Sequence, residues 1–127
     1  NNFSHKVIIP AHPRLKNNIT KEYSNIKFID PLGYHKFISY IKNSRGVVSD
    51  SGGIQCEASF FHKPTLTIRP STEHKVTLEL YNELIEPEEI EESRLVSSKL
   101  KPLPKFWDGN AGKRVVNFIL NYDNICL

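Results

Sequence analysis

Short apolar runs recur along the chain, and a turn signal or a helical pattern follows each of them. Four runs have the length and the β-branched or alternating composition of strands, at residues 6–10, 26–30, 46–49 and 65–68. A fifth run, residues 83–85, predicts a short edge strand. The first run ends at a proline and the second stops at an Asp-Pro pair, as expected for strand ends.

Helical patterns separate these strands. Apolar residues at the spacing i, i+3, i+4 predict three amphipathic helices, which begin near residues 34, 54 and 115. Residues 14–23 carry a weaker helical pattern. Pro87 followed by two glutamates is a typical helix start, since proline has no amide hydrogen to leave unpaired and acids suit the positive end of the helix dipole.

Strands that alternate with helices indicate α/β layering around a parallel sheet. The 127 residues are enough for one compact domain with a real core, and they contain no internal repeat or long linker. We therefore predict a single Rossmann-like three-layer α/β/α domain with a parallel sheet, spanning residues 1–127.

Composition excludes several classes of function. The net charge of +3, from 17 basic and 14 acidic residues, is too balanced to indicate a nucleic-acid partner. The apolar runs are too short to cross a membrane, and the start of the chain does not resemble a signal peptide. The lack of any methionine suggests a piece excised from a longer protein.

The cysteines and histidines point to no redox or metal chemistry. Cys56 and Cys126 have neither a disulfide framework nor metal-binding spacing, so a reducing, cytoplasmic compartment is expected. The five histidines lack the close spacing of metal ligands. We therefore expect neither a metal site nor a cofactor.

The most informative stretch, residues 47–58, places two glycines between a buried strand and an amphipathic helix. Gly52 and Gly53 allow a tight turn and a close ligand approach, and free amides at a helix N-terminus favour an anion. The pattern predicts a phosphate site, unless Ser51 merely caps the helix. Glu57, one turn further on, either reaches a sugar hydroxyl beside that phosphate or is a solvated helix residue.

Residues 50–58, DSGGIQCEA, closely resemble the DSGGIQEEA motif of the UDP-N-acetylglucosamine 2-epimerase family. Other segments resemble further family motifs in the correct order, and they are PAHPR, IDPLGY, KPTLTIR, STE and FWDGNA. The resemblance implies that residues 1–127 are the C-terminal, UDP-binding portion of a two-domain, GT-B-like epimerase. The N-terminal catalytic domain would then be absent from this sequence.

The resemblance also implies roles for individual residues. The UDP-binding set would be Ser51, Gly52, Gly53, Glu57, Tyr34 and Phe37. Ser51 and Gly53 would bind the diphosphate through hydroxyl and backbone amides, and Glu57 would accept hydrogen bonds from ribose hydroxyls. The segment with Tyr34 and Phe37 would lie beside the uracil.

A second group would face the cleft between the two domains, near the sugar or a regulatory nucleotide sugar: His12, Arg14, Arg69 and Glu73. From the residues alone, His12 could equally cap a strand end, and Arg69 and Glu73 could form a surface ion pair. The sequence departs from the family at Cys56, which replaces a glutamate. It departs again after Glu73, where the TERPE motif loses its arginine, proline and second glutamate.

The resemblance implies the interconversion of UDP-GlcNAc and UDP-ManNAc by elimination and re-addition of UDP. Elimination needs an acid and a base, which the N-terminal domain mainly supplies in the family, and no carboxylate pair stands out here. We therefore predict no catalytic residue in this chain, which would supply the UDP-binding half and be inactive alone. Its partners would be a UDP-sugar, the missing N-terminal domain and, since the family usually forms dimers, a second full-length copy.

Three alternatives stay open at this point. A hydrolysing 2-epimerase that releases ManNAc and UDP shares these motifs. A glycosyltransferase of similar two-domain architecture also places a glycine-rich turn and a glutamate on its nucleotide. A non-catalytic module that binds nucleotide sugars would need no acid or base at all.

Overall fold

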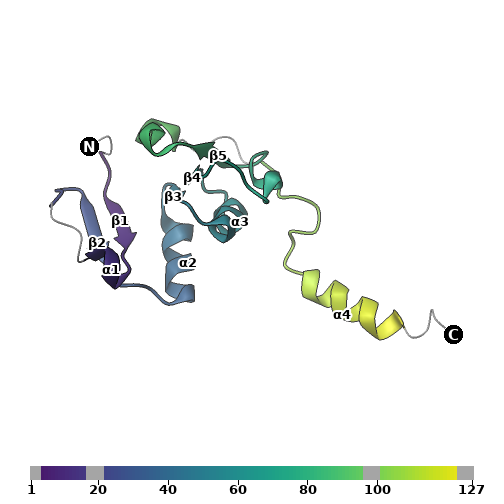
Figure 1. Cartoon of the computed structure of the whole chain (residues 1–127). Helices are drawn as coiled ribbons and strands as arrows, with labels where there is room; N and C mark the ends of the chain where they lie inside the picture. The colour runs from purple at the N-terminus through teal and green to yellow at the C-terminus, as the bar shows by residue number, and fades with distance from the viewer. Residues whose placement is uncertain (1–3, 17–21, 96–100, 123–127) are drawn as a thin grey trace.

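The computed structural model describes residues 4–16, 22–95 and 101–122, within which strands and helices alternate (Figure 1). The strands are β1 (Val7–Pro10), β2 (Ile26–Ile29), β3 (Val47–Ser49), β4 (Thr65–Ile68) and β5 (Asn82–Ile85). The α-helices are α1 (Pro13–Lys16), α2 (Tyr34–Asn43), α3 (Gly52–Phe60) and α4 (Ala111–Tyr122). Single turns of 3-10 helix form η1 (Lys75–Thr77), η2 (Pro87–Glu89) and η3 (Glu92–Arg94).

The five predicted strands are all present, and each predicted boundary lies within one residue of the observed one. The helix predicted over residues 14–23 begins at Pro13 and is helical to Lys16, beyond which residues 17–21 lie outside the described part of the chain. The helix predicted at Pro87 is one 3-10 turn, although Glu86 and Glu89 form a capping box there. It ends because Ile90 has extended backbone angles, φ −67° and ψ 105°.

Every strand pairing is parallel, as predicted for an α/β domain, but the strands do not form one sheet. β1 pairs with β2, and β4 lies between β3 and β5 in a separate sheet. In Figure 1 the β1–β2 pair stands apart from the three-stranded sheet. The predicted Rossmann-like α/β class is confirmed, but its parallel strands are divided between two sheets in the described residues, because β1 and β3 are not hydrogen-bonded to each other.

The core lies around β4, where a strand is flanked on both sides. Leu66 is 1% exposed, and Thr65 and Thr67 beside it are equally buried. Ala58 of α3 covers this sheet from one face and is completely buried. Burial of this apolar surface supplies most of the stabilisation of the domain.

Helix α4 has the predicted amphipathic pattern, but its apolar side chains are not buried in the core. It extends away from the rest of the molecule in Figure 1, and none of its described residues is buried. Six large apolar side chains on it are at least half exposed, namely Val115, Val116, Phe118, Ile119, Leu120 and Tyr122. A contiguous apolar surface of this kind is typical of an interaction surface.

An ion pair fixes the start of α4. The guanidinium of Arg114 donates to Asp108 at 2.9 Å, and the backbone N–H of Asn110 donates to the same carboxylate at 3.0 Å. The bond from Arg114 and then that from Asn110 lower the pKa of Asp108 from 3.8 to about 2. Because the folded pKa is the lower one, this contribution is present above pH 3.8 and is lost as the pH falls toward 2.

We expect Arg114→Gln to return the carboxyl pKa of Asp108 toward 3.8, because its strongest donor is removed. An NMR pH titration of the Asp108 side chain measures this directly. Arg94→Gln is the matched control, since Arg94 pairs with Glu83 and Glu89 instead. An unchanged Asp108 pKa in Arg114→Gln would show that the ion pair does not persist in solution.

Candidate functional site

The turn between β3 and α3 presents a helix N-terminus at the carboxyl end of the sheet. β3 ends at Ser49 and α3 begins at Gly52, with Ser51 between them in an extended conformation, φ −83° and ψ 128°. The Ser51 side chain makes no capping hydrogen bond, while its backbone N–H donates to Ser49 Oγ at 3.1 Å. The interpretation of Ser51 as a mere helix cap therefore has no support in the geometry.

Tyr34 and Glu57 meet across the contact between α2 and α3. Tyr34 is the first residue of α2 and is 63% exposed, whereas Glu57 lies half-buried in the middle of α3. The hydrogen bond of the Tyr34 hydroxyl to the Glu57 carboxylate, and then the negative charge of Glu57, raise the pKa of Tyr34 above 10.0. The phenol therefore remains a donor to Glu57 at neutral pH.

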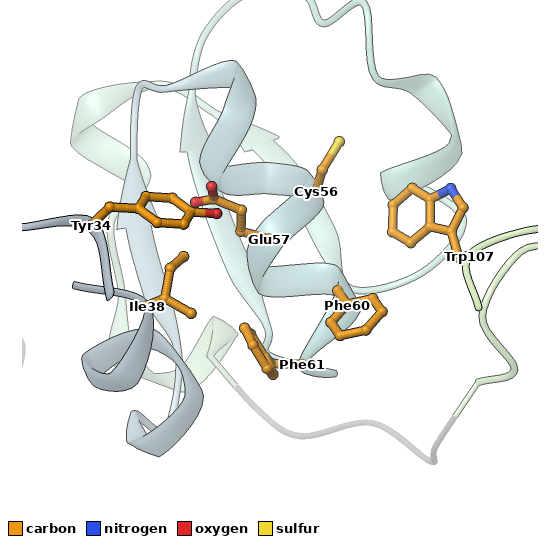
Figure 2. Close-up of a pocket in the computed structure, with 7 residues that line it drawn as sticks. All are labelled: Tyr34, Ile38, Cys56, Glu57, Phe60, Phe61 and Trp107. Carbon is orange, nitrogen blue, oxygen red and sulfur yellow. The ribbon is translucent and has the colours of Figure 1, made fainter. Parts of the chain in front are cut away.

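A pocket of about 390 Å³ opens beside this pair (Figure 2). Its lining comes from α2, α3 and the segment before α4, and consists of Tyr34, Ile38, Cys56, Glu57, Phe60, Phe61 and Trp107. The walls are mainly aromatic and aliphatic, and Glu57 is the one carboxylate in them. Apolar walls with a single strong acceptor suit a flat ring system that carries hydroxyl groups.

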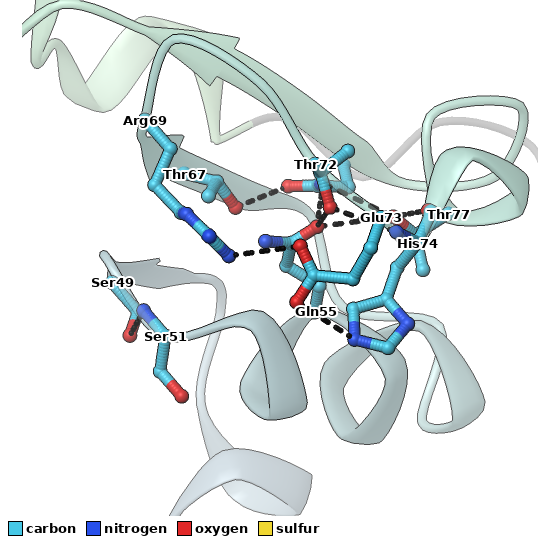
Figure 3. A network of polar contacts seen from close by, with 10 residues as sticks. Ser49, Ser51, Gln55, Thr67, Arg69, Thr72, Glu73, His74 and Thr77 are labelled. Carbon is cyan, nitrogen blue, oxygen red and sulfur yellow. Dashed lines mark hydrogen bonds and ion pairs between the residues drawn. The ribbon is translucent and has the colours of Figure 1, made fainter.

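Arg69, Glu73 and His74 lie beside the start of α3, as Figure 3 shows. Arg69 Nη1 and Glu73 Oε2 are 3.3 Å apart, and His74 Nε2 lies 3.5 Å from Glu73 Oε1. The backbone N–H of Glu73 itself and then the charge of Arg69 lower the pKa of Glu73. A Cβ atom at Gly52 would lie 2.6 Å from Glu73 Oε1, so this pair directly adjoins the glycine turn.

A buried polar network holds this segment against α3. Gln55 is 0% exposed, and its Oε1 accepts bonds from Thr72 Oγ1 at 2.7 Å, Asn82 Nδ2 at 3.0 Å and Thr77 Oγ1 at 3.5 Å. The backbone N–H of His74 donates to Thr72 Oγ1 at 3.0 Å. Gln55 thus connects α3 to the strand β5 and to the loop that carries Glu73 and His74 (Figure 3).

The structure groups only some of the residues that the sequence singled out. Tyr34 and Glu57 meet at the pocket, whereas Phe37 is half-buried on α2 and is not among the pocket-lining residues. His12 and Arg14 follow the carboxyl end of β1, where the Arg14 backbone N–H donates to His12 Nδ1 at 3.3 Å. They belong to the other sheet, so the interruption between the sheets separates them from α3.

Sequence reasoning missed part of the pocket wall. Phe60 and Trp107 belong to it although they are 47 positions apart (107 − 60), and no local periodicity connects them. It also missed Gln55 as the centre of a buried network. A buried glutamine on the core side of a helix was the available signal, because such a side chain must find partners inside the protein.

Cys56 is a passive part of the pocket wall. Partial burial, and then the negative charges of Glu57 and Glu73, raise the pKa of its thiol. Because the thiolate is the reactive form, this environment does not activate the cysteine.

Within residues 4–16, 22–95 and 101–122, no three His, Cys, Asp or Glu side chains are grouped as a metal site would need. No helix in those ranges has the length and apolar character required to cross a bilayer.

The fold is that of a Rossmann-like α/β protein with a glycine turn at the carboxyl end of a parallel strand. The sequence profile of the UDP-N-acetylglucosamine 2-epimerase family matches residues 1–120, so the chain belongs to this family. A UDP-N-acetylglucosamine 2-epimerase of Methanococcus maripaludis is 36% identical to it over 137 aligned positions. That match covers 94% of this chain and 37% of the relative, so the chain spans little more than a third of its length.

Solved structures agree with this assignment. The S. aureus MnaA-UDP co-structure has a TM-score of 0.75 and 30% identity, over 94% of this chain and 36% of that one. The Methanocaldococcus jannaschii UDP-GlcNAc 2-epimerase in complex with UDP-GlcNAc and UDP has a TM-score of 0.73 and 30% identity. That likeness covers 92% of this chain and 36% of the archaeal one.

Proposed function

We propose that this chain is the UDP-binding, C-terminal part of a UDP-N-acetylglucosamine 2-epimerase, which interconverts UDP-GlcNAc and UDP-ManNAc. The observation that carries the proposal is the arrangement of α3, with free amides at its N-terminus and Glu57 one turn further on at an apolar pocket. The bound UDP in two similar structures supports the same ligand here.

In this proposal the nucleotide lies along α3. The diphosphate accepts hydrogen bonds from Ser51 and from the amides of Gly52 and Gly53, where the helix dipole favours negative charge. The ribose hydroxyls donate to Glu57, and the uracil enters the pocket beside Tyr34. The Tyr34 hydroxyl and the Glu57 carboxylate already lie close together at this pocket, in keeping with the raised pKa of Tyr34.

The same groups would assist departure of UDP during the elimination. Negative charge grows on the diphosphate as the bond to the sugar breaks, and the α3 amides are already oriented toward it. Arg69 lies beside Gly52, where its positive charge offsets that of Glu73, whose carboxylate is closer still. The acid and base that act on the sugar would come from the N-terminal domain, so this chain by itself would be inactive as an isomerase.

One observation near the expected position of the sugar favours the alternative of a hydrolysing 2-epimerase. The sequence departs from the family pattern after Glu73, and Glu73 lies beside the glycine turn with His74 next to its carboxylate. Product analysis of the full-length protein distinguishes the two outcomes, because hydrolysis yields free ManNAc and UDP.

The full-length protein would act as a cytoplasmic enzyme. Its partners would be its own N-terminal domain and a second copy, and it would need no nucleic acid, membrane or cofactor.

The test is a titration of the chain with UDP, followed through backbone amide NMR shifts. We expect shifts confined to Ser51, Gly52, Gly53 and Glu57 and to the pocket around Tyr34. Ser51→Ala should weaken these shifts, because it removes one donor to the diphosphate. Millimolar UDP without any shift at the α3 N-terminus would contradict the proposal for this chain.

Glu57→Gln is expected to weaken UDP binding roughly tenfold, because a charged acceptor for two ribose hydroxyls becomes a neutral one. The same titration measures the effect. Glu88→Gln is the matched control, since Glu88 is exposed in η2 and remote from the pocket lining. Equal UDP affinities of Glu57→Gln and Glu88→Gln would show that Glu57 does not contact the nucleotide.

A further inference from the structure

The N-terminus of α3 already has an anion beside it, and that anion belongs to the protein. A Cβ atom at Gly52, the first residue of α3, would lie 2.6 Å from Oε1 of Glu73 and 3.0 Å from Nη1 of Arg69. Figure 3 shows both side chains beside the start of this helix. The Glu73 carboxylate therefore lies against the turn at which the diphosphate is expected.

The position of this carboxylate has an electrostatic cause. α3 has no acidic residue in its first turn, and Ser51 makes no side-chain capping bond to it. The free amides and the dipole at the start of a helix favour a negative charge. Glu73, from the loop that follows β4, supplies that charge from outside the helix. It therefore fills electrostatically the place that a phosphate would take.

The backbone around Glu73 is anchored, whereas its side chain is free to move. Thr72 Oγ1 donates to the buried Gln55 at 2.7 Å and accepts a bond from the N–H of His74 at 3.0 Å. The Glu73 side chain is 59% exposed, and its carboxylate lies 3.3 Å from Arg69 Nη1 and 3.5 Å from His74 Nε2. Exposed ion pairs of this kind hold a side chain only weakly.

A carboxylate and a diphosphate cannot share this helix end. Glu73 is ionised at neutral pH, since its own backbone N–H and the charge of Arg69 lower its pKa. Like charges in contact repel each other, so one of the two anions must leave. We propose that Glu73 is a resident anion of the nucleotide site, which the diphosphate displaces from the α3 N-terminus, and that Arg69 then changes partner from Glu73 to the diphosphate.

This exchange makes Glu73 a specificity-determining residue, and it rests on the proposed function because UDP is the displacing ligand. Glu73 lowers the affinity only for ligands that place a phosphate at α3. The planar guanidinium of Arg69 binds phosphate oxygens in the same way as carboxylate oxygens, so it can follow the arriving charge. The bound nucleotide thus sets the position of both side chains.

The experiment compares Glu73→Gln with the wild-type chain in titrations with UDP and with uridine, followed by amide NMR. At about 0.15 M salt, charges further apart than about 8 Å are largely screened. We expect Glu73→Gln to bind UDP about fivefold more tightly or better, because the competing charge is gone. Its affinity for uridine, which carries no phosphate, should not rise. Glu88→Gln is the matched control, since it removes the same charge from the exposed turn η2 and should leave the affinity for UDP unchanged.

A double variant tests the change of partner by Arg69. Arg69→Gln added to Glu73→Gln should weaken UDP binding about fivefold relative to Glu73→Gln alone, because the guanidinium that binds the diphosphate is lost. If Arg69 only neutralised Glu73, the double variant would bind UDP as Glu73→Gln does. That result would overturn the change of partner.

The outcomes separate this displacement from the UDP site itself. Equal UDP affinities of Glu73→Gln and Glu88→Gln, or an equal gain for uridine, would overturn the displacement and leave the UDP site in place. UDP bound by neither the wild type nor Glu73→Gln would contradict the proposed function and the displacement together.

Discussion

Gly52→Ala is expected to weaken UDP binding by tenfold or more, about 1.4 kcal/mol, while the chain keeps its fold. The new Cβ would lie 2.6 Å from Glu73 Oε1 and 3.0 Å from Arg69 Nη1, both far ends of flexible side chains that can move aside. Their displacement takes Arg69 from its place beside the helix N-terminus, and the methyl group obstructs the approach of a phosphate to the amides. The UDP titration by amide NMR measures the affinity.

Gly53→Ala is the matched control at the next position. A Cβ at Gly53 meets no other atom within 4 Å, and alanine favours a helix more than glycine does. We expect this variant to fold at least as stably as the wild type and to bind UDP more tightly than Gly52→Ala. Wild-type affinity in Gly52→Ala would show that the diphosphate does not lie at this helix end.

Gln55→Leu is expected to lower the free energy of unfolding by about 1–3 kcal/mol, because it leaves buried donors without their acceptor. The loss is partly offset because leucine also removes Gln55 Nε2, a buried donor without a partner in the described part of the chain. Thr72 Oγ1 loses its 2.7 Å bond, and Asn82 Nδ2 loses its 3.0 Å bond but keeps Thr77 Oγ1 at 3.1 Å. Both partners are buried, so water cannot replace Gln55 without a rearrangement. Urea unfolding followed by circular dichroism measures the change.

Ser59→Ala on the same helix provides the contrast. Ser59 is completely buried, and its hydroxyl has no hydrogen-bond partner in the described part of the chain. Removing it leaves no donor unpaired, so the stability should stay within about 1 kcal/mol of the wild type or rise. If Ser59→Ala lowered the free energy of unfolding as much as Gln55→Leu, the burial of these side chains in α3, and not the polar network, would determine both losses of stability.

Much of the fold could be predicted from the sequence because its signals are local. The runs at β1 and β4 are bounded by prolines or turns, and the stripe of α2 repeats at helical spacing. The interruption of the sheet could not be predicted in this way. It depends on which strands neighbour one another, and apolar runs such as those of β1 and β3 look the same beside an open edge as inside a sheet.

The candidate site, like the fold, could be predicted only where its residues are close together in the sequence. Ser51, Gly52 and Glu57 lie within a single turn and helix, so their order in the sequence already places them together. The pocket also needs Trp107, which lies far away in sequence, and chain folding alone brings it to Phe60. The role of Gln55 likewise depends on Thr72 and Asn82, whose positions follow from the loop geometry and the β4–β5 register.

The division of the sheet also affects how cooperatively the molecule unfolds. A three-stranded sheet with a buried central strand and a packed helix can open as one unit, whereas an isolated two-stranded pair is marginal in water. The pair β1–β2 is held to the larger unit by a few polar contacts of Ser4 and His5 with Glu92 and Arg45. We therefore expect two foldons of unequal stability, of which the β1–β2 pair, followed in the chain by His12 and Arg14, opens first.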